Sequence, residues 1–184
     1  IIRLLNKGKI KKKYISILTT AKNMELYSAA FTSELIDEQH NYQVYEQLGD
    51  LVGNQFIVWY IYRRFPQLKC MEGVKVAARL RINYGSKQSF YKFADNLGFW
   101  PYISATNDLR YRKKKDLLED VFEAFLGVTA LILDEEVKIG VGNAVIYQFL
   151  KIIFDEIPIS MRFEDLYDAK TRLKELFDIY EDQL

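Results

Sequence analysis

The chain has 184 residues and a formal net charge of +1; 49% of its residues are hydrophobic, and only nine are Gly and three Pro. This composition suits one globular domain built from long helices rather than a turn-rich β architecture. The single Cys70 and the single His40 exclude an internal disulfide and a zinc site made from those ligands, so a bound metal would need oxygen ligands, as Mg²⁺ and Mn²⁺ do. No apolar stretch has the length of a membrane span and no signal peptide opens the chain, so we expect an intracellular protein without membrane contacts.

Hydrophobic periodicity predicts helices along most of the chain. Residues 1–23 form a basic, weakly amphipathic extension, which fits either a short helix or an arm. Seven helices are then expected, at about 24–35, 42–64, 68–84, 86–97, 112–133, 143–156 and 169–180. The predicted fold class is therefore all-α, a bundle of about seven helices with no convincing strand.

The helix expected at 42–64 is apolar around much of its circumference, which predicts a buried, central position. It carries Glu46 and Asp50 four residues apart, and therefore on one face. Gly49 and Gly53 share a similar spacing and leave a groove where another backbone can come close. Trp59, on the same helix, is expected in the core.

The helix expected at 112–133 contains the stretch DLLEDVFEAFLG, with Asp120 and Glu123 three residues apart in an apolar run. Two acids directed into a packed face cost several kcal/mol unless a cation compensates them. By itself the pair fits a salt-bridged helix equally well. If the two long helices pack antiparallel, however, four carboxylates converge, and divalent cations such as Mg²⁺ would have to hold them together.

Two stretches resemble the ribonuclease III family. YEQLGDLVGNQFIVWYIYRRFP is similar to the signature helix of its endonuclease domain, and DLLEDVFEAFLG is similar to its second acidic stretch. Their order and separation also fit, over roughly residues 24–154. The resemblance implies an all-α, dimeric domain that uses Mg²⁺, for which Mn²⁺ can substitute, to hydrolyse double-stranded RNA to 5′-phosphate and 3′-hydroxyl ends.

Carried over residue by residue, the family's catalytic and metal-binding acids fall on Glu46, Asp50, Asp120 and Glu123. The sequence departs from the family pattern at two neighbouring positions. Gln43 replaces a common Glu, which would alter contacts with RNA. Gln47 replaces an aromatic residue that packs into the partner subunit in bacterial members, so a homodimer would need a differently packed interface.

The tail DAKTRLKELFDIY resembles the opening of the double-stranded-RNA-binding domain of these enzymes. The expected organisation is an extension at 1–23, an endonuclease domain at 24–160, and at 161–184 a linker with the first helix of such a domain, which we expect to continue beyond Leu184.

Lys113, Lys114 and Lys115 precede Asp120 by about two turns and are candidate RNA contacts, although a solvated helix face explains them as well. Two other functions stay open: a catalytically impaired scaffold that binds double-stranded RNA or a protein partner, and a helical-bundle nucleotide pyrophosphatase. A composition rich in Lys, Ile, Tyr and Asn indicates an AT-rich genome, such as that of some large DNA viruses.

Overall fold

The computed structural model describes residues 1–85 and 87–181 and, over these ranges, contains eleven α-helices, two short 3₁₀ helices and no strand. Seven of the α-helices run for ten residues or more. The predicted all-α class is therefore confirmed. None of the helices in the described ranges is both long and apolar enough to cross a membrane.

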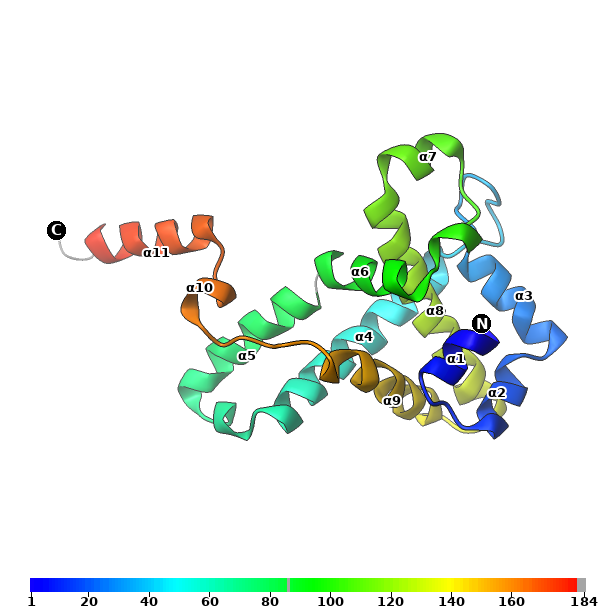
Figure 1. Ribbon diagram of the computed structural model, residues 1–184, viewed down its shortest axis with the longest axis horizontal. Coiled ribbons are helices and arrows are strands. Elements are labelled where there is room, and N and C mark those ends of the chain that lie inside the picture. The colour runs from blue at the N-terminus through cyan, green and yellow to red at the C-terminus, as the bar shows by residue number, and fades with distance from the viewer. Residues whose placement is uncertain (86, 182–184) are drawn as a thin grey trace.

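The helices follow one another along the chain as shown in Figure 1. They are α1 (Ile2–Lys7), α2 (Lys12–Leu18), α3 (Ala21–Ala30), α4 (Gln43–Arg64), η1 (Pro66–Leu68), α5 (Met71–Tyr84), α6 (Lys87–Leu97), η2 (Trp100–Tyr102), α7 (Asn107–Arg112), α8 (Lys114–Glu136), α9 (Val141–Asp155), α10 (Phe163–Leu166) and α11 (Ala169–Glu181). Pro66 ends α4 because proline cannot continue a helix, and Gly98 closes α6 with a positive φ of 79°.

Helix α8 is the centre of the fold. Every residue from position 121 to position 130 is buried, which matches a sequence that is apolar apart from Glu123 and Thr129. Helices α4, α6 and α9 pack around it, and α4 makes the most extensive contact. A cluster of aromatic rings fills the space between them, including Phe90, Phe99, Phe122 and Phe125.

Helices α2 and α3 pack on the C-terminal half of α8, α1 contacts α2, and Leu5 and Leu18 are fully buried. The side-chain amide of Asn23 donates hydrogen bonds to the Ile17 carbonyl and to Glu136 Oε1, over 2.9 Å and 2.8 Å. The N-terminal segment is thus built into the core of the domain, while the boundary at residue 23 stays a prediction.

At the other end of the chain, α10 lies on α5. Leu166 is buried, and the Asn83 amide donates to the carbonyls of Asp165 and Leu166. The last helix, α11, extends away from the bundle (Figure 1), and Asp168 caps its first turn by accepting a hydrogen bond from the Thr171 amide. The double-stranded-RNA-binding assignment of this tail stays a prediction, and residues 182–184 of it lie outside the described residues.

The prediction that Trp59 belongs to the core is wrong, because 47% of its surface is exposed. Trp59 lies on the outer face of α4, where its ring stacks against the Arg63 guanidinium, 5.4 Å from the ring centroid. Hydrophobicity indicated burial correctly for the opposite face of the helix only.

Candidate active site at the crossing of two helices

Helices α4 and α8 run antiparallel and touch through their backbones. A Cβ atom added to Gly49 would lie 1.7 Å from the carbonyl oxygen of Glu123, and one added to Gly127 would lie 2.0 Å from that of Tyr45. Neither position can hold a side chain at this separation. The two glycines therefore set how closely the helices approach, and the groove predicted from Gly49 is occupied by the backbone of α8.

The close approach brings together the acids predicted from the sequence. Glu46 and Asp50 flank Gly49 on α4, and Asp120 and Glu123 lie on the facing part of α8. Glu123 is 7% exposed, Glu46 and Asp120 are half-buried, and Asp50 reaches solvent. The antiparallel packing on which their convergence depended is confirmed.

The electrostatics of Glu123 show that these carboxylates share one site. Its pKa is raised to about 9, first by burial and then by the negative charges of Glu119, Asp50, Glu46 and Asp120. Each neighbouring charge and the loss of water favour the protonated carboxyl. A cation placed among them would reverse this shift, because it favours the ionised form.

Glu119 is a fifth acid of this cluster that the sequence reasoning missed. Glu119 is buried, and of the four neighbouring acids its charge raises the pKa of Glu123 the most. The missed signal was its spacing, since Glu119 precedes Glu123 by four residues and therefore lies on the same face of α8.

Tyr42 and Glu34 extend the site toward the segment that precedes α4. The Tyr42 ring is buried, and its pKa is raised by burial and then by the charges of Asp120 and Glu34, which interact with its hydroxyl. Asp50 is held from the other side, because the Asn54 amide donates to its Oδ1 atom over 2.8 Å. Neither Tyr42 nor Glu34 had been singled out from the sequence, because their proximity to Asp120 is purely tertiary.

The donor set of the cluster is made only of carboxylate oxygens, which suits a hard cation such as Mg²⁺. In the ranges 1–85 and 87–181, no three His, Cys, Asp or Glu side chains converge closely enough to ligate one ion as they stand. The acids interact at electrostatic distance, so ligation would require side-chain rotation on the fixed helices. The chemistry of the residues fits a divalent cation.

A family model described as the ribonuclease III domain matches residues 43–134, half of the chain and the part that contains both acidic helices. The chain belongs to the ribonuclease III family.

Three curated relatives are similar to this chain. A protein of Invertebrate iridescent virus 6 named for ribonuclease 3 is 43% identical over 89% of this chain and 60% of its own length. One of Frog virus 3 (isolate Goorha) with the same name is 42% identical, over 95% of this chain and 47% of its own length. The ribonuclease 3 of Lactobacillus acidophilus is 33% identical, over 91% of this chain and 74% of its own length. The chain thus spans about half to three-fifths of the two viral relatives.

Among solved structures, the nuclease domain of ribonuclease III from Campylobacter jejuni has the same fold. It superposes with a TM-score of 0.59 over 78% of this chain and 98% of that domain, at 22% sequence identity. The ribonuclease III fold is thus kept where the two sequences have diverged widely.

The predicted RNA-contact residues of this ribonuclease III domain are exposed and precede the acids along the two helices. Gln43 begins α4, and Lys113, Lys114 and Lys115 form the start of α8. Lys114 already forms an ion pair within the chain, since its ammonium lies 3.2 Å from Asp95 Oδ1.

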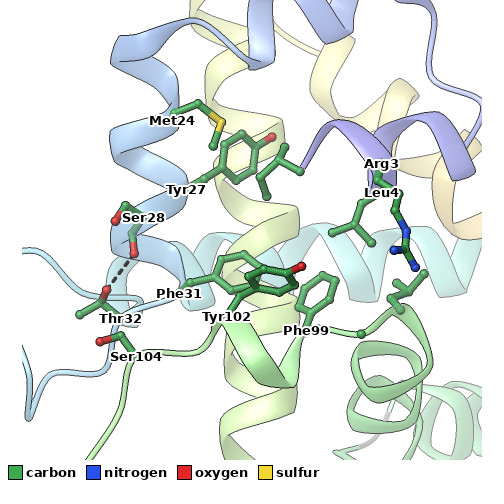
Figure 2. A pocket seen from close by; sticks show the side chains of 13 residues that line it. Arg3, Leu4, Met24, Tyr27, Ser28, Phe31, Thr32, Phe99, Tyr102 and Ser104 are labelled. Atoms are coloured by element: carbon green, nitrogen blue, oxygen red, sulfur yellow. Dashed lines mark hydrogen bonds between the residues drawn. The ribbon is translucent and has the colours of Figure 1, made fainter.

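A separate cavity of about 420 Å³ lies away from the acids, between α1, α3 and the segment that contains η2. Figure 2 shows Tyr27, Phe31 and Phe99 along its wall and Arg3 at its edge. Its lining contains no acid among the described residues, so this cavity is not part of the cluster on α4 and α8.

Proposed function

We propose that this protein is a Mg²⁺-dependent endonuclease that hydrolyses double-stranded RNA. The observation that carries the proposal is the carboxylate cluster at the α4–α8 crossing, with Glu123 buried at its centre. Four neighbouring acids and burial raise the pKa of Glu123 to about 9, and a polar site of this kind is costly to fold unless cations compensate it. Membership of the ribonuclease III family supports the reaction type.

In this proposal Glu46, Asp120 and Glu123 hold the cation, and Asp50 assists directly or through water. A bound Mg²⁺ supplies activation of water at neutral pH and neutralisation of the charge that develops on the phosphate. The chain's own contribution is to fix the carboxylates on two helices whose separation cannot change. Hydrolysis leaves 5′-phosphate and 3′-hydroxyl ends.

Double-stranded RNA is recognised mainly by shape, through its phosphates and 2′-hydroxyls. Lys113, Lys114 and Lys115 supply positive charge at the start of the helix that carries Asp120. Gln43, one turn before Glu46, supplies a neutral hydrogen-bonding group beside the acids. A phosphate backbone that passes the carboxylates would meet both groups.

The partner subunit is a second copy of the chain, bound on the outer face of α4. Large apolar side chains are exposed there at helical spacing, among them Val44, Leu48, Leu51, Val58 and Tyr62. An apolar stripe of this kind on a soluble protein is typical of an interface. The structure from Campylobacter jejuni also concerns a region involved in dimer formation of that nuclease domain. Gln47, at the edge of the stripe, is exposed and fills the place of an aromatic residue.

The decisive experiment incubates the purified chain with an RNA duplex, the single strands and a DNA duplex, in Mg²⁺, in Mn²⁺ and in EDTA. Cleavage of the RNA duplex alone, lost in EDTA and in Glu123→Gln, is the expected result. Glu135→Gln is the matched control, because Glu135 lies on the same helix but is exposed and outside the cluster.

Two outcomes would replace the proposal. An RNA duplex that is bound but stays intact under every condition assigns a scaffold function. Conversion of nucleoside triphosphates without cleavage of RNA assigns a nucleotide-hydrolysing enzyme.

An intracellular location, and a large DNA virus as source, are also proposed, the latter supported by the two viral relatives.

A further inference from the structure

Positive charge is distributed very unevenly along this chain. Residues 1–22 carry seven of the 26 basic side chains and none of the 25 acidic ones, so the remaining 162 residues have a net charge of −6. The residues matched by the family model lie entirely within this acidic remainder. A protein that binds a polyanion needs a local surplus of cations, and the first 22 residues supply one.

Five of these cations are concentrated in a segment that we call the basic arm, residues 7–13. All of its lysines are exposed, namely Lys7, Lys9, Lys11, Lys12 and Lys13. None of the five forms an ion pair with any residue in the described part of the chain. The ammonium groups are therefore available to an external anion.

The basic arm is held rigidly, unlike an ordinary solvated run of charge. Leu5 and Ile10, at either side of its turn, are buried, and the Ile10 amide donates to the Leu5 carbonyl over 3.1 Å. Gly8 lies so close to α9 that an added Cβ would be 2.1 Å from the Phe149 ring. Lys9 has a φ of 52°, a conformation that a residue with a side chain adopts only when its surroundings enforce it.

The basic arm itself packs on α9 through Gly8 and Phe149, and the N-terminal segment that carries it also contacts α8 far from the acids. Through α3, the N-terminal segment is fixed to the C-terminal end of α8 by the hydrogen bond from Asn23 to Glu136. Glu136 is thirteen residues beyond Glu123 on the same helix, about 20 Å along its axis. A single double-stranded-RNA-binding module contacts about 16 base pairs, so one duplex is long enough to reach both places.

We propose that the basic arm is a second binding surface for the phosphate backbone of double-stranded RNA, in the segment that precedes the residues matched by the family model. This inference deepens the proposed function, because it assigns part of the grip on the substrate to residues that take no part in cleavage. The contacts are with phosphates, so they add affinity for any duplex sequence.

The test measures binding of a labelled RNA duplex in EDTA, by fluorescence anisotropy between ~50 and ~200 mM salt. Replacing all five lysines of the basic arm by alanine should weaken binding at least 10-fold. The slope of log affinity against log salt should fall by about one for each phosphate that the variant no longer neutralises. The matched variant with five Lys→Arg changes keeps the charge and should bind like the unmodified chain.

A second control, Lys69→Ala with Lys75→Ala and Lys138→Ala, removes three exposed lysines outside the basic arm and should change the affinity less than twofold. Unchanged affinity and salt slope in the five-alanine variant, or an equal loss in this control, would overturn the inference. So would retention on anionic vesicles in place of the RNA duplex.

Cleavage in Mg²⁺ is measured in parallel to separate the two proposals. If RNA is cleaved normally and the five-alanine variant binds the duplex as tightly as the unmodified chain, only the proposal for the basic arm is refuted. Lysine-dependent binding without cleavage refutes the nuclease alone.

Discussion

The two faces of α4 differ in what covers them. The inner face carries Gly49, Glu46 and Asp50 and lies against α8, so every feature of it has a counterpart within the same chain. The outer face presents large apolar side chains such as Leu51, 68% exposed, that nothing in the described residues covers. The inner face shows how one chain builds the acid cluster, and the outer face is where we propose that a second chain binds.

The largest expected effect concerns the inner face. Glu123→Gln should lower the rate of RNA duplex cleavage more than about 100-fold, since loss of groups that merely support a metal ligand already costs 10- to 100-fold. Single-turnover cleavage in Mg²⁺ measures it, with Glu135→Gln expected to retain the rate. A Glu123→Gln variant with a normal rate would show that the cluster is structural only.

The backbone contact on the inner face should be nearly as sensitive. Gly49→Ala forces a Cβ against the Glu123 carbonyl, and we expect about 3 kcal/mol of destabilisation. That corresponds to a fall of roughly 6–12 °C in Tm for a chain of this size. Gly53→Ala is the matched control: its added Cβ would meet side chains and no backbone, the Phe90 ring at 3.0 Å and Leu126 Cδ1 at 3.9 Å, and should cost less than about 1 kcal/mol. Equal effects of the two changes in thermal unfolding would contradict this account.

On the outer face, Leu51→Arg should weaken self-association and leave the folded monomer intact. A charge placed in an apolar interface costs about 2 kcal/mol, which raises the dimer dissociation constant about 30-fold. Analytical ultracentrifugation measures the association. The unfolding free energy at low protein concentration should change by less than about 0.5 kcal/mol, because Leu51 is exposed in the monomer. An unchanged association would place the dimer contact elsewhere.

The pH dependence of stability without divalent cations tests the raised pKa of Glu123. The folded protein holds the pKa of Glu123 at about 9, above its ordinary value of 4.5. The folded state therefore binds the proton more tightly, and stability from this group is lost as the pH rises from about 4.5 through 9. Urea unfolding of Glu123→Gln should show a shallower loss over this window. Parallel curves for the two proteins would argue against the raised pKa.

Only part of the site could be predicted from the sequence. The four acids were predictable because helical spacing places Glu46 with Asp50, and Asp120 with Glu123, on one face each. Glu119 has the same kind of spacing relative to Glu123 and lies within the stretch DLLEDVFEAFLG, but it was missed. Tyr42 and Glu34 join the site only through tertiary contacts, which no periodicity encodes. Trp59 was assigned to the core because hydrophobicity does not show which face of an apolar helix is exposed.

Because Gly49 contacts the Glu123 carbonyl, the spacing of the acids does not depend on which side chains fill the core. The closest distance between α4 and α8 is set by two backbones, so exchanging core side chains for others of similar volume alters stability while the helices still meet at the same place. Packing residues of this domain are therefore free to drift or to be redesigned, as long as the two positions without a side chain, Gly49 and Gly127, are left unchanged.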